Sequence, residues 1–203
     1  PGTRHTYRVR DQGALARIVK KSFYVAAGGR PGSILVDLPK DVLAGKADFK
    51  YPGKVKWRAY QPHLEPHPNQ VSKAVELMLA AKKPILYAGG GVIMSRASKP
   101  LLTLAEKLQI PVTNTLMGLG GFPGTHPLFI GMLGMHGLYQ ANMAVQDCDL
   151  LIAVGARFDD RVTGRLDKFA TNAKIIQIQF DPPSIHNPNP TDVPMAADDP
   201  QAL

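Results

Sequence analysis

Beyond residue 68 the sequence alternates between short apolar runs and amphipathic segments. The clearest run is Leu150–Val154, five apolar residues that lead into Gly155-Ala156-Arg157. Runs without a polar position are typical of strands buried on both faces of a parallel sheet. Each such strand needs a crossover, usually a helix, to return the chain to the same end of the sheet. The alternation therefore predicts an α/β fold with a Rossmann-like, doubly wound parallel sheet.

The spacing of apolar residues sets the expected elements. Helices are expected at 11–27, 69–82, 97–109 and 137–146, and strands at 34–36, 84–88, 111–113, 150–154 and 174–180. Asn69 is the expected N-cap of the second helix. Residues 43–68 are polar, proline-containing and aperiodic, which is typical of a linker. We therefore divide the chain into a helix–strand piece at 1–45, a linker at 46–68 and an α/β domain at 69–203.

Charge and composition narrow the classes of partner. The net charge is +8, but the basic residues are spread out, and their densest run, Lys46–Arg58, lies in no recognisable nucleic-acid motif. We expect solvation or a phosphorylated cofactor rather than nucleic acid as the reason for this charge. No apolar stretch approaches the roughly 20 residues that cross a bilayer, so no membrane contact is expected. Cys148 is the single cysteine, which excludes an internal disulfide. The chain begins with Pro1-Gly2 and no Met, so we expect it to be part of a longer protein.

Glycine or polar residues follow each expected strand of the domain. They are Gly89-Gly90-Gly91, Thr115-Leu116-Met117-Gly118, Gly155-Ala156-Arg157 and Asp181. In doubly wound sheets ligands bind at the carboxyl ends of the strands, where the winding direction changes. Glycine lets the backbone approach a ligand closely, and an arginine can pair with a pyrophosphate. This pattern predicts a dinucleotide site, although three glycines also fit an ordinary tight turn. The GxGxxG fingerprint is absent, which disfavours a standard NAD site.

Two further segments differ from ordinary loops. Gly131–Gly137 is a glycine- and methionine-rich run before a helix, and its His136 and methionines fit either a ligand site or a structural role. Phe158–Gly164 is a charged loop at a strand end, which fits either a binding site or a surface ion-pair network. No metal-binding spacing and no Ser/His/Asp or Cys/His motif is present. We therefore predict no catalytic residue and no metal site in this chain.

The residues also resemble a known family. Gly29–Val42, Tyr87–Val92, Thr115–Gly137 and Asp149–Gly164 closely resemble the catalytic (large) subunit of acetohydroxyacid (acetolactate) synthase, a thiamine-diphosphate enzyme. The resemblance implies that residues 1–45 end the pyrimidine-binding domain and that 69–203 form the central FAD-binding domain. The thiamine-activating glutamate and the Mg-diphosphate motif would lie outside this chain, so we expect the chain alone to be inactive.

The resemblance also implies site residues. Those expected to bind FAD are Arg30, Gly89, Gly90, Gly91, Thr115, Leu116, Met117, Leu133, Gly134, Met135, His136, Gly155, Ala156, Arg157, Asp159, Arg161, Val162 and Asp181. Those expected to line the substrate channel are Lys40, Met135, Asp160 and Arg161, with Arg161 gripping the carboxylate of the second keto acid. The sequence departs from the family at Gln179, where an acidic residue is usual near the ribose, and after residue 186. Asp198 aligns only loosely with a family aspartate near the adenine.

The whole enzyme of this family decarboxylates pyruvate and joins the hydroxyethyl unit to a second 2-keto acid, in branched-chain amino-acid synthesis. The resemblance implies FAD, thiamine diphosphate and Mg as cofactors. It implies the remaining domains of the subunit, a homodimer or tetramer, and a regulatory small subunit as partners. The location would be cytoplasmic in a bacterium and organellar (mitochondrion or plastid) in a eukaryote. The alternatives are another thiamine-dependent carboligase or decarboxylase, a stand-alone nucleotide module for a ligand such as NAD, and an anion- or nucleic-acid-binding scaffold.

Overall fold

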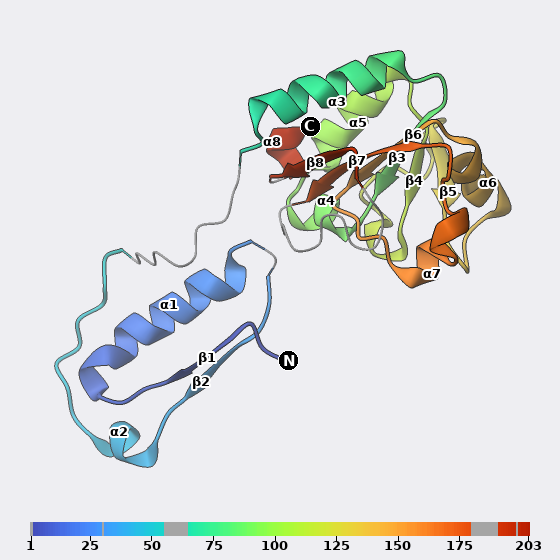
Figure 1. Ribbon diagram of the computed structural model, residues 1–203. Coiled ribbons are helices and arrows are strands. Elements are labelled where there is room, and N and C mark those ends of the chain that lie inside the picture. Colours follow the sequence, from blue (N-terminus) through green and yellow to red (C-terminus); the bar gives the residue numbers. More distant parts are fainter. Residues whose placement is uncertain (1, 30, 55–64, 180–190, 198) are drawn as a thin grey trace. The chain divides into compact units, whose positions relative to one another are not determined.

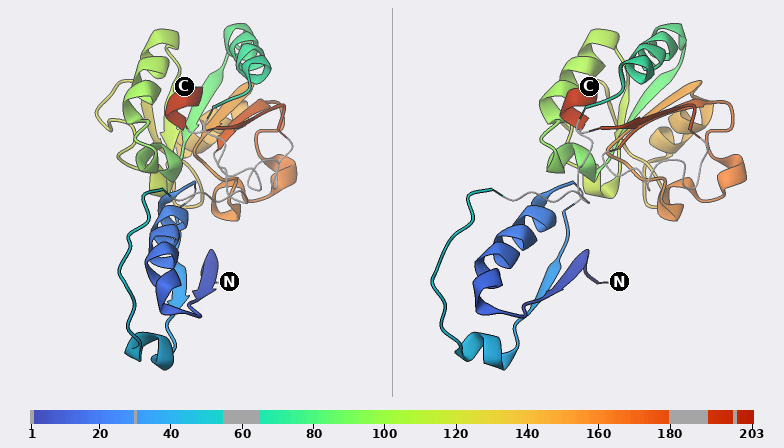
Figure 2. Two further views of the ribbon diagram at one scale, coloured as in Figure 1. Left: turned by 90° about the vertical axis from the view of Figure 1, so that its left-hand side faces the viewer. Right: turned by 60° about the vertical axis from the view of Figure 1, so that its left-hand side comes forward.

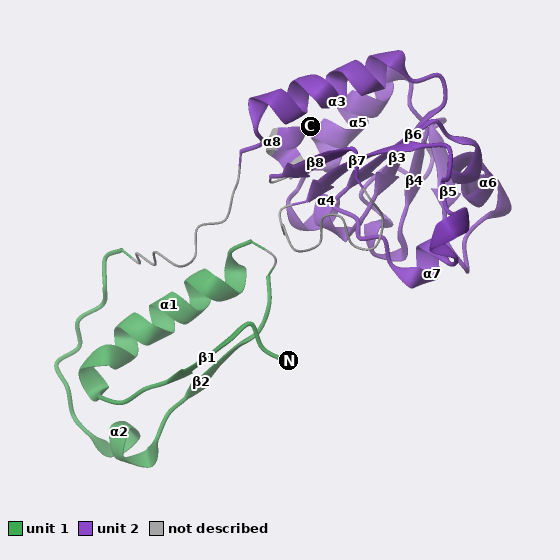
Figure 3. Cartoon of the chain, viewed as in Figure 1, with its two compact units in different colours: residues 1–62 green, residues 63–203 purple. Residues whose placement is uncertain are grey.

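The structure is a computed structural model that describes residues 2–29, 31–54, 65–179, 191–197 and 199–203. The chain divides into two compact units, residues 1–62 and residues 63–203 (Figure 3).

The first unit is a small parallel pair of strands with helices. Its elements are β1 (His5–Arg8), the 3₁₀ turn η1 (Gln12–Ala14), α1 (Leu15–Ala27), β2 (Ile34–Asp37) and α2 (Lys40–Ala44). Helix α1 and strand β2 lie where the sequence predicts them. Strand β1 was not predicted, because its sequence His-Thr-Tyr-Arg carries no apolar run and only Tyr7 is partly buried. It pairs in parallel with β2, from His5 opposite Ile34 to Arg8 opposite Asp37.

The second unit holds the α/β domain. Its elements are α3 (Pro68–Ala80), β3 (Pro84–Ala88), α4 (Gly90–Met94), α5 (Ser98–Leu108), β4 (Val112–Asn114), η2 (Leu116–Gly118), β5 (Phe129–Met132), α6 (Tyr139–Asp147), β6 (Leu150–Val154), α7 (Asp160–Thr163), η3 (Leu166–Lys168), β7 (Lys174–Gln179), β8 (Val193–Ala196) and α8 (Asp199–Ala202). The six strands form one parallel sheet in the order β5-β4-β3-β6-β7-β8. The predicted α/β class with a parallel sheet is therefore confirmed.

The winding direction of this sheet reverses once. From β3 the chain adds β4 and then β5 on one side, and it then returns to place β6 on the other side of β3, followed by β7 and β8. The switch point therefore lies between β3 and β6, which pair from Pro84 opposite Leu150 to Ala88 opposite Val154. A crevice at the carboxyl ends of these two strands is where such sheets bind ligands.

Helices cover both faces of the sheet, as Figures 1 and 2 show. On one face α3, α4 and α5 pack against alternate strand residues such as Leu86 and Ile152. On the other face α6 packs through Ala141 and Val145 against the residues between them, such as Leu151. Because β3 and β6 have apolar cover on both sides, all five residues of β6 are buried, as the apolar run predicts.

Several local predictions were wrong. The N-cap of α3 is His67, whose Nδ1 accepts from the Asn69 N–H, because Pro68 takes the first helical position. Strands β5 and β8 were not predicted. Strand β5 contains Gly131 at φ +94° and pairs with β4 through a register shift, and β8 is an edge strand that contains Pro194. Glycine and proline both weaken the strand pattern, and an edge is where proline is tolerated.

Candidate functional site

The turns that follow β3 and β6 are packed directly against each other at the switch point. The N–H of Gly89 donates to the carbonyl of Val154, and the N–H of Gly91 donates to the carbonyl of Gly155, each at 2.9 Å. A side-chain carbon on Gly89 would collide with the Gly155 carbonyl and the Ala156 Cα. The chain itself therefore requires glycine at position 89, because two strand-end turns must pass within backbone contact.

The turn after β4 joins the same cluster. The Thr115 N–H donates to the Ala88 carbonyl (2.9 Å), and the Thr115 Oγ1 accepts from the Gly118 N–H (2.9 Å). A Cβ on Gly90 would lie 3.1 Å from the Met117 Cβ, so the turns after β3 and β4 are in contact. Leu116 and Met117 nevertheless remain 70% and 76% exposed. Two large, exposed apolar side chains at the carboxyl end of a strand offer a surface for a flat apolar group.

The loop after β5 reaches the segment after β6. Gly134 adopts φ +104°, a conformation that other residues rarely take, and its N–H and carbonyl are both held by the side chain of Asn142. The next residue, Met135, donates its N–H to the Arg161 carbonyl at 2.9 Å. Met135 and His136 are exposed, whereas Leu133 is buried in the core. Residues that are about 25 positions apart in the sequence thus form one surface.

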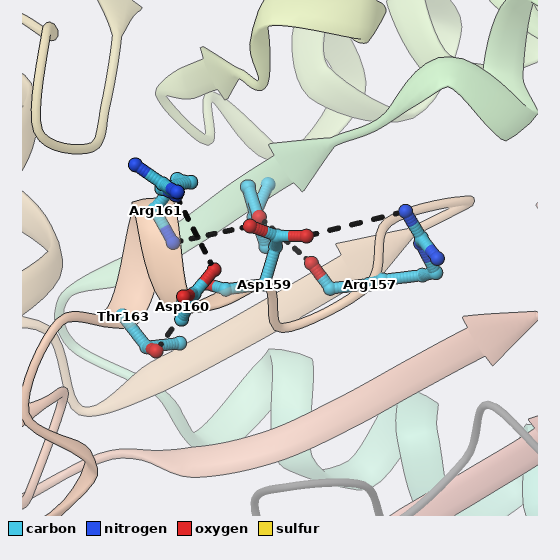
Figure 4. Close-up of polar contacts among 6 residues, drawn as sticks. Arg157, Asp159, Asp160, Arg161 and Thr163 are labelled. Atoms are coloured by element: carbon cyan, nitrogen blue, oxygen red, sulfur yellow. Dashed lines mark hydrogen bonds and ion pairs between the residues drawn. The ribbon is translucent and has the colours of Figure 1, made fainter.

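Residues 158–164, predicted as a charged loop, contain the short helix α7 (Asp160–Thr163). Asp159 is its N-cap: Oδ1 accepts from the Arg161 N–H at 3.1 Å, and the Asp159 carbonyl accepts from the Thr163 hydroxyl at 3.3 Å. Figure 4 shows the Asp159 carboxylate between Arg157 and Arg161. Its Oδ2 lies 4.0 Å from Arg157 Nη2, and Asp160 Oδ1 lies 3.7 Å from Arg161 Nε. These contacts form an exposed ion-pair network around the N-terminus of α7.

The charge state of this network follows from its contacts. The Arg161 backbone N–H, the Asp160 side chain and the nearby guanidinium groups together hold the pKa of Asp159 below its ordinary value. Asp159 is therefore ionised at neutral pH. Both arginines remain largely exposed, with the Arg157 side chain at 55%. Exposed pairs of this kind are weak, so a phosphate group can compete for the guanidinium groups at little cost.

Tyr87 fixes the backbone of Arg157. The Tyr87 hydroxyl donates to the Arg157 carbonyl at 3.2 Å, and burial raises the pKa of Tyr87, so the hydroxyl keeps its proton. The Tyr87 ring packs against Phe158, with ring centroids 5.9 Å apart. The core thus holds the main chain at position 157 while the guanidinium stays available to a ligand.

The structure brings most of the sequence-predicted site residues together. Those at the carboxyl edge of the sheet are Gly89, Gly90, Gly91, Thr115, Leu116, Met117, Leu133, Gly134, Met135, His136, Gly155, Ala156, Arg157, Asp159, Asp160, Arg161 and Val162. Lys40 is the first residue of α2, in the other unit, and is exposed. Arg30, Asp181 and Asp198 lie outside the described residues. Gln179 ends β7 and is buried.

Sequence reasoning missed Tyr87 and Asn142, which contact the site segments without belonging to them. Tyr87 was predicted in a buried strand and in a family-like segment but not as a site residue, although a tyrosine in an apolar run signals a hydroxyl that needs a partner. In the described part of the chain, no group of three or more His, Cys, Asp or Glu side chains is placed to hold a metal ion. None of the described helices is long and apolar enough to cross a membrane.

Comparison with known proteins identifies the domain. Residues 71–203 match the family described as "Thiamine pyrophosphate enzyme, central domain". The chain belongs to this family. A crystal structure from Mycobacterium smegmatis, described as that of a thiamin diphosphate-dependent enzyme, has the same fold: it matches with a TM-score of 0.77 at 24% identity, over 100% of this chain and 38% of that one.

Several relatives of the chain are named acetolactate synthases. The chain is 48% identical over 198 residues to an acetolactate synthase of Mycobacterium bovis, covering 98% of this chain and 32% of that protein. It is 43% identical over 205 residues to the acetolactate synthase isozyme 3 large subunit of Escherichia coli, covering 100% of this chain and 36% of that protein. The chain therefore spans about a third of the length of these relatives.

Proposed function

We propose that the chain is the central, FAD-binding portion of an acetolactate synthase large subunit. The observation that carries this proposal is the convergence of four strand-end segments, after β3, β4, β5 and β6, on the switch point of the sheet. The identity to acetolactate synthases over nearly the whole chain supports the same assignment. We assign residues 1–45 to the end of the preceding pyrimidine-binding domain, 46–68 to a linker and 69–203 to the central domain.

The residues at the switch point fit the parts of FAD. Arg157 has a fixed main chain and an exposed guanidinium, which suits a pyrophosphate. Leu116, Met117 and Met135 present exposed apolar surface, which suits the flat ring systems at the two ends of a dinucleotide. Gly90 has no Cβ, and this lets the turn after β3 lie against Met117 in the turn after β4. We also propose Arg30 and Asp181, which lie outside the described residues, as FAD-binding residues of the complete protein.

The same surface supports a role in the substrate channel. Arg161 carries an exposed guanidinium paired only weakly with Asp160, and a planar fork of this kind suits the carboxylate of a 2-keto acid. Met135 is tied to the Arg161 backbone and would form an apolar part of the wall. We also propose Lys40, the first residue of α2, as a channel residue of the complete protein.

In the complete protein we propose the reaction of acetolactate synthase: pyruvate is decarboxylated and its hydroxyethyl unit is joined to a second 2-keto acid. Thiamine diphosphate and Mg would supply that chemistry from residues outside this chain, so these 203 residues alone are expected to be inactive. Because relatives are named as large subunits, we propose partner subunits, including a second copy and a regulatory small subunit. A bacterial protein of this kind would be cytoplasmic, and a eukaryotic one organellar.

Comparing two arginine variants of the chain tests the placement of FAD. Arg157→Ala removes a guanidinium at the switch point, whereas Arg165→Ala removes one that pairs with Asp167 on the surface (2.7 Å). We expect FAD binding to weaken by about tenfold to a hundredfold in Arg157→Ala, because a charged hydrogen bond to phosphate is lost, and to change little in Arg165→Ala. Isothermal titration with FAD measures both. Equal losses in the two variants would refute the placement of the pyrophosphate beside Arg157.

A further inference from the structure

We propose that Asn142 is a positioning residue that holds the loop after β5 in its ligand-binding shape. Asn142 lies on α6, outside every segment assigned to FAD or the channel. Its side chain grips both polar groups of one glycine: the Gly134 N–H donates to Asn142 Oδ1 at 2.9 Å, and Asn142 Nδ2 donates to the Gly134 carbonyl at 3.1 Å. This inference rests on the proposed FAD site.

The chemistry of the contact explains why an asparagine suits the position. A side-chain amide offers one acceptor and one donor, which match the donor and acceptor of the Gly134 main chain. A carboxylate offers only acceptors, and an aliphatic side chain offers neither. The two hydrogen bonds form a clamp, which Gly134 needs because it adopts φ +104°. Its Cα also lies close to the Arg161 carbonyl, and an added Cβ would be only 3.0 Å from the carbonyl oxygen. Two directional hydrogen bonds select this conformation among the many open to glycine.

The clamp residue Asn142 lies on a helix that is anchored in the core. Helix α6 is anchored in the core by Ala141 and Val145, which are fully buried, so Asn142 has a fixed base. The loop is tied at its other end to α7, where the Met135 N–H donates to the Arg161 carbonyl at 2.9 Å. Asn142 therefore sets the position of Gly134 directly, and those of Met135 and Arg161 through it. The residue acts on ligand binding through the loop and has no need to touch the ligand.

Two Asn142 variants test this role through FAD binding. Asn142→Ala removes both hydrogen bonds while keeping a good helix former, and we expect FAD affinity to fall by about tenfold. In Asn142→Asp, a carboxylate at neutral pH cannot donate to the Gly134 carbonyl, so affinity also falls. As the pH is lowered toward about 4, the protonated carboxyl regains a donor, and the affinity relative to the wild-type chain at the same pH should recover. Asn142→Ala should show no such recovery, and Gln140→Ala, an exposed change on the same helix, should bind as the wild type does.

Amide hydrogen exchange of the ligand-free chain tests the clamp independently of FAD. We expect the Gly134 N–H to lose protection at least tenfold in Asn142→Ala and to keep it in Gln140→Ala, because a lost hydrogen bond exposes the amide to local opening. If Gly134 loses protection in Asn142→Ala as expected but the wild-type chain does not bind FAD, the proposed function is wrong. The role of Asn142 in holding Gly134 is then still supported. If Gly134 exchange is unchanged in Asn142→Ala, or if the FAD affinity of Asn142→Asp shows no recovery at low pH, the positioning role is overturned.

Discussion

Individual glycines at the sheet edge are required for different physical reasons. Gly89 has ordinary extended backbone angles, φ −106° and ψ −175°, so any residue could adopt its conformation. What excludes a side chain there is the backbone of Gly155 and Ala156 on the neighbouring turn. Gly134, in contrast, has a positive φ and is held by Asn142. The run of three glycines after β3 is therefore in part a packing requirement of the switch point, and its presence alone does not prove a ligand.

This packing makes Gly89→Ala a sharp test at the residue scale. The added methyl group would meet main-chain atoms, which cannot move aside as a flexible side chain can, so we expect a loss of about 1–3 kcal/mol in the free energy of unfolding. Gly124→Ala is the control, because its methyl group would make ordinary contact with the Phe129 ring at 3.8 Å. Urea denaturation monitored by circular dichroism measures both. Equal stability of the two variants would contradict the close packing of the turns after β3 and β6.

At the scale of elements, Asp149 joins the amino-terminal ends of three strands. Its carboxylate accepts from the Lys82 N–H (2.7 Å) and the Lys83 N–H (2.9 Å), just ahead of β3. Its own N–H donates to the Lys83 carbonyl, and its carbonyl accepts from the Lys174 N–H at the start of β7. Asp149 itself immediately precedes β6. One residue thus sets the register of three neighbouring strands, β3, β6 and β7, at the edge opposite the candidate site.

Asp149→Ala should therefore lower stability without weakening FAD binding. We expect a loss of about 1–2 kcal/mol in the free energy of unfolding at neutral pH, because two main-chain donors lose a charged acceptor. Asp147→Ala, an exposed change at the end of α6, is the matched control and should stay within about 0.5 kcal/mol of the wild type. A loss of FAD affinity as large as that of Arg157→Ala would show that Asp149 is not confined to the opposite edge.

The same residue gives a pH dependence with a defined sign. Burial tends to raise the pKa of Asp149, but the N–H groups of Lys82 and Lys83 outweigh it, so the folded pKa lies below the ordinary value. A carboxyl with a lowered folded pKa stabilises the fold above its unfolded pKa of about 3.9, and this contribution disappears as the pH falls through the folded pKa. The stability difference between wild type and Asp149→Ala should therefore shrink below about pH 4.

At the scale of the whole molecule, net charge and fold make different predictions about the ligand. A charge of +8 by itself suits any polyanion, whereas the convergence of turns at a switch point suits a dinucleotide. We expect FAD at about a hundred times its Kd to stabilise the chain by about 2.7 kcal/mol, seen as a rise in the unfolding temperature. The same concentration of NAD should give a smaller rise, and duplex DNA should give none at physiological ionic strength. A larger effect of NAD or DNA would favour one of the two alternative classes.

The fold class, the α/β layering and most central elements could be predicted from the sequence, because they depend on local patterns. Apolar runs without a polar position mark β3 and β6, isoleucines mark β7, and helical spacing marks α1, α3 and α5. The match to thiamine pyrophosphate enzymes over residues 71–203 confirms the family that the motifs suggested. Edge strands β5 and β8 were not predicted, because Gly131 and Pro194 interrupt their apolar pattern. Their strand conformation also depends on a neighbouring strand.

The amino-acid sequence by itself determined which residue types follow the strands: glycines, the apolar Leu116 and Met117, and the arginines Arg157 and Arg161. Only the tertiary structure decided which of them meet. Gly89 faces Ala156 across 67 positions of sequence, and Asn142 clamps Gly134 from a separate helix. Such contacts follow from strand order and crossover direction, which place distant segments side by side. Local periodicity carries no information about those neighbours, because it records only which face of its own element a residue occupies.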